Sequence, residues 1–571
     1  MATLKRIVVR LLATIGALFV LSLIGIAASA WYLSRSEPGL PDRMVVTLDL
    51  RNGIAEVASD PLATLGIDRE PTLTQVVLAL HAASKDERVV GLLVRLDGQG
   101  PGFAQIQDLR DAVMEFGARD KQTVAHSDSF GEFGPGNSGY YLASVFDQIE
   151  LQPMGSVGLT GLYLETPLAR GLLDKIGVEP SGDRRGAYKT IYDTFFETSM
   201  TPAHEESLQS LASSLDEQFQ GGIAEGRGLD GAKVSDLIDG GPYMAQEALD
   251  LGLVDQLRYW HDAVEAMRDL AGPDGDLVGL LDYASTIETD SEAPVVALVH
   301  GVGQIQRGNS EQGPIGGWVM GSDTVARALS NAIDADEVEA VLFRISSGGG
   351  SAVASDTIAH QVRRAVEADK PVIVSMGDVA ASGGYWIAMD ATKIVAQPGT
   401  LTGSIGVVAG KPVLDKLYRE LGVAWGHAQR GTNANMWTTT ENYTASGRAR
   451  LEAFLDTTYN AFTEGVARGR DLPEDDVEKI AQGRVWTGAQ AKEHGLVDQL
   501  GGLASALTLV REEIGVSPEA PLRLRRFPAP RSLWEQALQL IGNVQTRFSS
   551  LEGWLARSFP GSLSAPTIMV R

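Results

Sequence analysis

The sequence contains no cysteine. This absence excludes disulfide bonds, catalysis by a thiol and metal sites built from thiolates. It does not identify the compartment, because a chain without cysteine is compatible with oxidising and reducing surroundings alike. Any catalytic nucleophile would therefore be a side chain of another type.

Basic residues are also scarce, with 48 Lys and Arg against 73 Asp and Glu and a formal net charge of −25. Binding to nucleic acid phosphates requires concentrated Lys and Arg, so we expect no nucleic acid partner. The negative charge favours solubility of any part outside a membrane. The 571 residues are enough for at least two domains.

An uncharged, mostly apolar run occupies residues 11–33, directly after three basic residues. As a helix it would span about 34 Å, which is enough to cross a bilayer. The basic residues before the run predict that residues 1–10 are cytoplasmic and that the remainder is translocated. The alternative is a cleavable signal peptide, since Ala28-Ser29-Ala30 has the form of a cleavage site. The length of the run favours an uncleaved transmembrane signal anchor.

The rest of the chain is duplicated internally. Residues 138–143 (Ser-Gly-Tyr-Tyr-Leu-Ala) match residues 383–388 (Gly-Gly-Tyr-Trp-Ile-Ala) at a spacing of 245 residues. Gln152-Pro153 and Gln397-Pro398 keep the same spacing. Such a long-range repeat predicts two domains of one fold.

Short runs of Val, Ile and Leu alternate with helical patterns inside each repeat. We expect buried strands at residues 89–96, 338–345 and 371–375, and helices at residues 105–116 and 354–366. The order of strand, Gly-rich turn, helix and strand predicts an α/β fold built from repeated ββα-type units.

The repeats define the expected domains. The N-terminal repeat takes residues 40–271, a linker rich in Pro, Gly, Asp and Ser takes 272–293, the C-terminal repeat takes 294–515 and a tail takes 516–571. Within the tail, the apolar spacing of residues 533–555 predicts an amphipathic helix. That helix would pack on its own domain, lie on a membrane surface or cover the active-site opening.

Ser382 is a candidate nucleophile because it stands between an expected strand and an expected helix. At such a turn the helix dipole and the amide of Gly383 can stabilise an oxyanion that forms on an acylated serine. The alternative is an ordinary helix N-cap, which is the commoner role for a serine at this position.

A second Gly-rich loop, residues 346–351 (Ser-Ser-Gly-Gly-Gly-Ser), also lies between a strand and a helix. Its amides could supply another oxyanion donor, for which we select Gly349. A tight structural turn and a phosphate cradle are the alternatives. No Lys follows the glycines as it does in a P-loop, so a phosphate site is disfavoured.

A serine nucleophile needs a base, and none of the eight histidines lies in a comparable Gly/Ser-rich turn. A His-based triad therefore lacks support, although its members meet only in the folded chain. Lysine can act as the base when burial keeps it neutral. Lys189 is our candidate, because Tyr188, Ile191 and Phe195 surround it in sequence. The alternative is an ordinary solvated lysine.

Five motifs together resemble the signal peptide peptidase A family in its long form, also called protease IV. They are residues 186–189 (Gly-Ala-Tyr-Lys), the loop 346–351, and residues 381–385 (Ala-Ser-Gly-Gly-Tyr), 401–406 (Leu-Thr-Gly-Ser-Ile-Gly) and 482–488 (Gln-Gly-Arg-Val-Trp-Thr-Gly). The resemblance runs from about residue 40 to 515. It implies that Ser382 is the nucleophile, Lys189 the general base, Gly383 and Gly349 the oxyanion donors, and Ser404 the hydroxyl that orients the lysine.

The same resemblance implies a fold and a setting. We expect a tandem duplication of a Clp protease/crotonase-like spiral domain, preceded by one transmembrane helix, in a homo-oligomer that is a tetramer. The implied substrates are cleaved signal peptides and other apolar peptides, hydrolysed without metal or cofactor. The implied location is the bacterial inner membrane, with the catalytic body on the periplasmic side and the lipid bilayer as a partner.

The internal repeat places the two members of this Ser/Lys dyad, Ser382 and Lys189, in different halves. At the spacing of 245 residues, Ser382 corresponds to Asn137, Ser404 to Leu159, and Lys189 to Ala434. Each half keeps one member of the dyad, so we expect the active site at the joint between them.

The sequence is also compatible with two other functions. The family usually has proline where this chain has Gly348, and loss of its fixed φ would loosen the oxyanion loop. That departure motivates a catalytically impaired scaffold that binds membrane peptides. A crotonase-like acyl-thioester enzyme would share the oxyanion loops but would not need a Ser/Lys pair.

Overall fold

The computed structural model describes residues 39–57, 71–98, 100–287, 290–312 and 317–529, with Gly16, Leu21, Ser22 and Gly25 before them. The expected anchor at 11–33, apart from those four residues, and the expected helix at 533–555 lie outside the described residues. Within the described ranges, no helix combines the length and the hydropathy that crossing a membrane requires.

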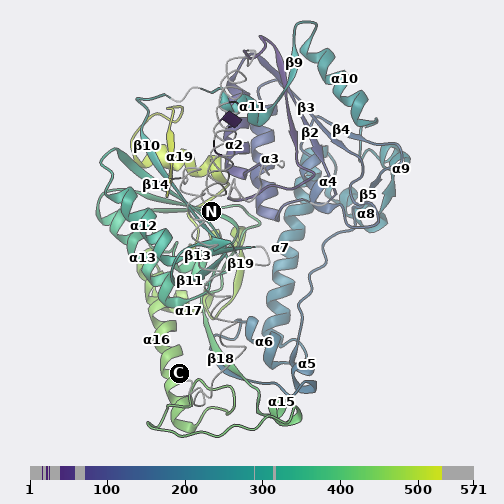
Figure 1. Ribbon diagram of the computed structural model, residues 1–571. Helices are drawn as coiled ribbons and strands as arrows, with labels where there is room; N and C mark the ends of the chain where they lie inside the picture. Colours follow the sequence, from purple (N-terminus) through teal and green to yellow (C-terminus); the bar gives the residue numbers. More distant parts are fainter. Residues whose placement is uncertain are drawn as a thin grey trace, which may run out of the picture.

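Two mainly parallel sheets have corresponding strand orders. The first runs β8-β4-β3-β2-β1-β9, and the second contains the path β20-β16-β15-β14-β10-β21, with β17 also paired to β15 and β19 paired to β17. Figure 1 shows β2, β3 and β4 of the first sheet in purple and blue, and β10 and β14 of the second in teal. The strands of the first sheet are β1 (Met44–Asp49), β2 (Val89–Leu96), β3 (Gln122–Ser127), β4 (Gln148–Leu151), β8 (Gln256–Leu257) and β9 (Asp276–Gly279). Those of the second are β10 (Val295–Val302), β14 (Val338–Ser347), β15 (Val372–Ala381), β16 (Lys393–Ala396), β17 (Leu401–Gly403), β19 (Val485–Thr487), β20 (Gln499–Leu500) and β21 (Arg523–Phe527).

Helices alternate with the strands in both halves. In the first half they are α2 (Leu73–Lys85), α3 (Phe103–Gly117), α4 (Asn137–Ala143), α5 (Arg170–Lys175), α6 (Ile191–Phe196), α7 (Pro202–Arg227), α8 (Gly231–Gly240), α9 (Ala245–Asp250), α10 (Trp260–Ala271) and α11 (Leu280–Ser285). In the second they are α12 (Ser322–Ile333), α13 (Ala352–Glu367), α14 (Gly383–Trp386), α15 (Asp415–Glu420), α16 (Ala445–Arg470), α17 (Glu474–Ile480), α18 (Gly488–Glu493) and α19 (Leu503–Glu513). The α/β class is therefore confirmed.

Shorter strands lie outside the two sheets. Strands β5 (Ser156–Val157) and β7 (Tyr243–Met244) form an antiparallel pair, as β17 and β19 do in the second half. Strands β11 (Gln304–Gln306), β12 (Glu311–Gln312) and β13 (Trp318–Gly321) form a small sheet beside the second half.

The strands and helices expected from hydrophobic patterning are present. Residues 89–96 form β2, and the runs at 338–345 and 371–375 form most of β14 and the start of β15. The helices expected at 105–116 and 354–366 are α3 and α13, each slightly longer than the pattern. Fully buried strands need continuous apolar residues, which is why these runs were recognisable.

The segment 272–293, expected as a linker, contains regular structure. Strand β9 pairs in parallel with β1, and β21 pairs in the same way with β10. Only Leu277 and Val278 mark β9 as apolar. A four-residue strand surrounded by turn-forming residues has almost no periodic signal, so its pairing depends on the exposed edge of β1.

A shared core fixes the two halves against each other. One hydrophobic cluster includes most buried residues of the first half together with Leu342, Ile373 and Val395 of the second sheet. Helix α19 of the second half contacts both β15 and α2. Because close-packed interiors resist sliding, this core holds the halves in one register.

A buried ionic cluster adds a specific contact across the same joint. Arg344 of β14 donates to Glu56 at 2.9 Å and to Asp108 at 2.9 Å, both from the first half. Burial alone would raise the pKa of Glu56, but Arg344 outweighs burial and holds that pKa low. At Asp108, burial is the larger effect and raises the pKa. Arg344 thus ties two carboxyl groups of the first half to the second sheet.

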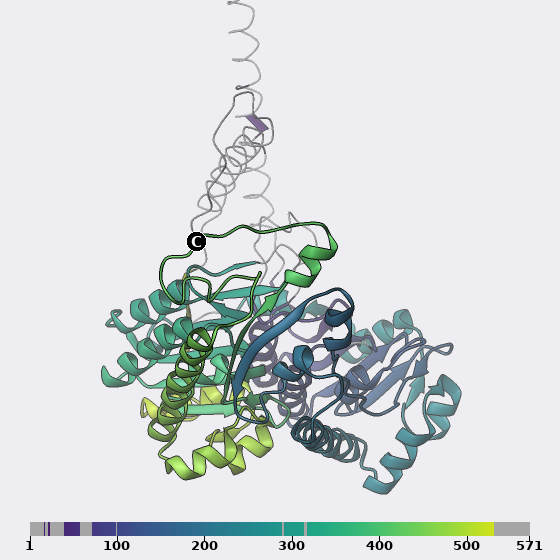
Figure 2. The same ribbon diagram turned by 90° about the horizontal axis from the view of Figure 1, so that it is seen from below.

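An antiparallel ribbon is the third link between the halves. Strand β6 (Glu179–Arg185) of the first half pairs along its full length with β18 (Val407–Val413) of the second. Figure 2 shows this blue and green ribbon between the two halves. The chain leaves β6 directly into the turn that carries Lys189.

Candidate active site

Ser382 follows the last residue of β15 and precedes α14. Its φ of 55° and ψ of −119° put a non-glycine residue in a rarely populated conformation. The Ser382 side chain makes no capping hydrogen bond to α14. The N-cap alternative is therefore wrong, and the strained turn instead presents Oγ as a nucleophile elbow does.

Lys189 lies in the turn after β6 and reaches Ser382 from the other half of the same chain. Its side chain is buried, with an exposed fraction of 5%. The Lys189 Nζ lies 2.9 Å from Ser382 Oγ, within hydrogen-bonding distance. The solvated-lysine alternative is wrong, and the two residues meet within one chain.

Ser404 completes the contacts of the lysine amine. Nζ lies 2.9 Å from Ser404 Oγ and 2.8 Å from the Ser404 carbonyl oxygen. A neutral amine has two N–H bonds and one lone pair. Two donations to Ser404 leave the lone pair for the Ser382 hydroxyl, so these contacts fit the deprotonated lysine.

Burial lowers the pKa of Lys189 to about 7. Desolvation penalises the ammonium form, and no carboxylate offsets it among the causes that act on this group. A substantial fraction of Lys189 is thus neutral near pH 7, as a general base requires.

The two glycine positions proposed as oxyanion donors differ. The Gly383 N–H has no hydrogen-bond partner within the described ranges, and Gly383 lines the cavity at Ser382. The Gly349 N–H instead donates to Ser347 Oγ at 3.1 Å. From the glycine loop, Gly350 lines the cavity, and its N–H is likewise without a partner in the described part of the chain.

The cavity beside Ser382 and Lys189 is small, and only part of its wall is apolar. Its volume is about 90 Å³. Besides the dyad and the two glycines, its lining includes Ala352, Trp386, Gly406, Val407, Val408, Thr458 and Phe462. It has space for a small group and an apolar wall that would exclude water from the reacting atoms.

A turn at residues 482–484 is hydrogen-bonded to the two loops that carry Lys189 and Ser404. The Gln482 carbonyl accepts from Tyr188 N at 2.9 Å, and the Arg484 carbonyl accepts from Ser404 N at 2.7 Å. Gly483 has a φ of +80°, and a Cβ there would lie 2.6 Å from Lys189 N. The turn is therefore a rigid spacer between two loops that are distant in sequence.

Sequence reasoning used residues 482–488 as a family motif but gave them no role. The signal was the glycine between two larger residues in a motif shared with the family. The function of this turn depends on which backbone it packs against, and the periodicity of apolar residues carries no information about that packing.

The described part of the chain contains no metal site, since no group of three His, Asp or Glu side chains converges there.

Comparisons with known proteins show which family the chain resembles in sequence. The sequence profile described as Peptidase family S49 matches residues 134–273 and 364–517. The "Serine protease SPPA, chloroplastic" of Arabidopsis thaliana is 29% identical over 512 residues, covering 87% of this chain and 73% of that protein. "Protease 4" of Salmonella typhi is 30% identical over 459 residues, covering 78% of this chain and 72% of that protein.

A solved structure of a ClpP1 point mutant from Listeria monocytogenes is also similar over part of the chain. The match covers 38% of this chain and 94% of that chain, with 14% identity and a TM-score of 0.24.

Proposed function

Because the chain belongs to peptidase family S49 and is a serine peptidase, we propose that it is a membrane-anchored endopeptidase with a Ser382/Lys189 dyad. The observation that supports this most directly is the distance of 2.9 Å between the hydroxyl of Ser382 and the amine of a buried lysine. The depressed pKa of Lys189, about 7, gives that lysine the basicity the reaction needs.

In the proposed reaction, Ser382 Oγ attacks the peptide carbonyl carbon while Nζ of Lys189 takes the hydroxyl proton. The oxyanion accepts hydrogen bonds from the amides of Gly383 and Gly350. We propose Gly350 rather than Gly349 because the Gly349 N–H is already bonded to Ser347. The C–N bond then breaks and Lys189 returns its proton to the leaving amine. Water, deprotonated by Lys189, hydrolyses the acyl-enzyme and releases a carboxylate.

Ser404 and the 482–484 turn would act by positioning Lys189. Two acceptors on Ser404 fix the direction of both N–H bonds, so the lone pair faces Ser382. Neither group is consumed in the reaction.

The proposed substrates are signal peptides after their cleavage, together with other apolar peptides. The apolar cavity wall of Trp386, Phe462 and Val407 supports this assignment. The run at 11–33 would anchor the enzyme in the bacterial inner membrane, with residues 39–529 on the periplasmic side. We also propose a homo-oligomer, a tetramer by the family resemblance.

The test is hydrolysis of fluorogenic apolar peptides by the full-length chain, alongside fluorophosphonate labelling of the serine. Ser382→Ala is expected to abolish both. Lys189→Ala is expected to lower both by about 10⁴-fold, because the hydroxyl loses its base.

Lys121→Ala is the matched control. Lys121 donates to two backbone carbonyls in the first half, those of Ala83 and Asp86, and lies outside the cavity at Ser382. It should retain activity and labelling. Full cleavage by Lys189→Ala would refute the dyad, and a parent protein that binds these peptides without cleaving them would be the impaired scaffold instead.

A further inference from the structure

A second hollow lies beside the cavity of the dyad. Its volume is about 540 Å³, and it is lined by Gln304, Ile305, Gln306, Arg307, Gly350 and Ser351. Gly350 also lines the cavity that contains Ser382 and Lys189. The two spaces therefore border the same glycine loop.

The backbone on both sides of this hollow is fixed. Ile305 N donates to Gly349 O at 2.9 Å, and Ser351 N donates to Ile305 O at 2.9 Å. Strand β11 is thus bonded to the glycine loop. The side chains of Gln304 and Gln306 share one face of the strand, because side chains alternate along it.

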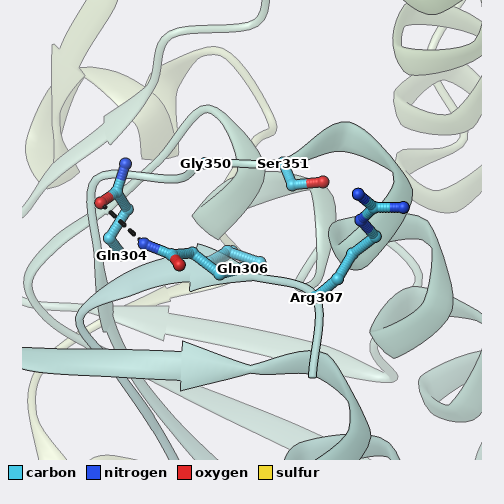
Figure 3. A pocket seen from close by; sticks show the side chains of 6 residues that line it. Gln304, Gln306, Arg307, Gly350 and Ser351 are labelled. Atoms are coloured by element: carbon cyan, nitrogen blue, oxygen red, sulfur yellow. Dashed lines mark hydrogen bonds between the residues drawn. The ribbon is translucent and has the colours of Figure 1, made fainter. Parts of the chain in front are cut away.

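The polar side chains around the hollow can all donate hydrogen bonds. Figure 3 shows the guanidinium of Arg307 and the hydroxyl of Ser351 on one side, and Gln304 bonded to Gln306 on the other. No carboxylate lines the space. Arg307 forms no ion pair in the described part of the chain, although the protein has 73 acidic residues against 48 basic ones.

Helix α13 adds charge of the same sign. Its 16 residues begin directly after Ser351, so the positive end of its dipole faces this region. The nearest acidic residue of the small sheet, Glu311, is on β12, and β13 separates it from β11. An arginine, donor side chains and a helix N-terminus around one space suit a carboxylate ligand.

We propose that this hollow is an anchoring subsite for a carboxylate of the peptide substrate, with Arg307 as the residue that determines specificity. The proposal rests on the proposed peptidase function. The carboxylate can be a free C-terminus or the side chain of Asp or Glu. A free C-terminus is the group that hydrolysis of a peptide bond creates. The subsite would therefore let the enzyme prefer fragments released by an earlier proteolytic cleavage over intact chains.

The experiment uses internally quenched apolar peptides with the full-length chain. One pair differs only in a free C-terminal carboxylate against a C-terminal amide, and a second pair carries Glu or Gln in an amidated peptide. Each pair is made with the variable group at successive distances from the scissile bond. We expect kcat/KM to be about fivefold to tenfold higher for the carboxylate, through KM, in at least one register. Raising the salt concentration should reduce that ratio.

Arg307→Gln should bring the ratio of carboxylate to neutral peptide close to one, and Arg307→Lys should restore part of it. Arg119→Gln is the matched control, because Arg119 is an exposed arginine of the first half. It should keep the parent ratio. A ratio near one for the parent in every register, or a parent ratio that survives in Arg307→Gln, would overturn the subsite. Which pair responds identifies the source of the carboxylate.

Failure of the subsite can be distinguished from failure of the proposed peptidase function. If the parent cleaves no peptide, the peptidase proposal fails, and the subsite is decided by equilibrium binding. Ser382→Ala should bind a labelled carboxylate peptide more tightly than its amide by fluorescence anisotropy. Equal binding would refute the subsite. A parent that cleaves acid and amide peptides equally would refute the subsite and leave the peptidase intact.

Discussion

The two halves repeat one topology but use the equivalent position at the start of the short helix in different ways. In the second half, Ser382 directs its side chain to Lys189. In the first half, the corresponding Asn137 donates to Gly161 O at 2.8 Å and accepts from Thr160 N at 3.0 Å. Residues 159–161 correspond to the loop that carries Ser404. In the first half, the side chain that corresponds to Ser382 is therefore bound to the neighbouring backbone.

A second comparison concerns the turn that carries the base. Gly186 has a φ of +97° and Gly431, its counterpart, a φ of +95°. A Cβ at Gly186 would lie 2.2 Å from Gln482, whereas one at Gly431 would meet nothing within 4 Å. The local turn is the same, but only the first is packed under the other half. Burial lowers the pKa of a lysine, so the packing distinguishes the two turns.

The largest expected effect comes from transplanting the first-half residue into the second half. Ser382→Asn should lower peptide hydrolysis by about 10⁴-fold or more, because the amide cannot form an acyl-enzyme. Hydrolysis of an apolar fluorogenic peptide by purified protein measures it. Activity within tenfold of the parent would show that Ser382 is not the nucleophile.

The reciprocal change should not create a second site. Asn137→Ser places a hydroxyl where Ala434 would have to act as base, so fluorophosphonate should still label one serine per chain. Intact-mass measurement counts the labels. A second label at position 137 would show that a serine in the first half becomes reactive without a lysine at position 434.

The next effect concerns two arginines at equivalent positions, Arg344 on β14 and Arg95 on β2. Arg344→Met should lower the free energy of unfolding by about 3–5 kcal/mol, because it leaves Glu56 and Asp108 buried without their cation. Arg95→Met should lower it by about 1 kcal/mol or less, since Arg95 pairs with a half-exposed Asp128. Denaturant unfolding of both variants tests this, and equal losses would contradict a joint-specific role for Arg344.

Gly483→Ala should lower kcat about 100-fold with little change in KM, because an added Cβ displaces the Lys189 backbone. Gly422→Ala is the control. It has a similar φ of +75° and open space around it. Steady-state kinetics of both variants separate packing from backbone strain. If both lose kcat equally, the 482–484 turn is not what positions the base.

The pH dependence is the smallest effect. Protonated Lys189 cannot accept the serine proton, so kcat/KM should fall about tenfold per pH unit below pH 7. Above the pKa of about 7 it should level off. A pH profile of kcat/KM with the amidated neutral peptide measures this. A flat profile from pH 5 to pH 8 would contradict a buried lysine base.

Much of this architecture could be predicted from the chain. The apolar runs of β2 and β14 specified buried strands, and the spacing of 245 residues specified the duplication. Strand β9 was not predictable, since Leu277 and Val278 alone do not form a pattern. Gly350 was not distinguishable from Gly349, because which amide remains free depends on where Ser347 Oγ lies.

By itself, the sequence determined that Ser382 and Lys189 lie in different halves and occupy non-equivalent positions of the repeat. The sequence also indicated the family, because the five family motifs occur in it in the expected order. Only the tertiary structure decided that Lys189 is buried to 5% exposure and 2.9 Å from its serine. Burial and distance arise when the core, the ribbon and the 482–484 turn bring the halves together. A pKa depends on that surrounding medium rather than on neighbours in sequence.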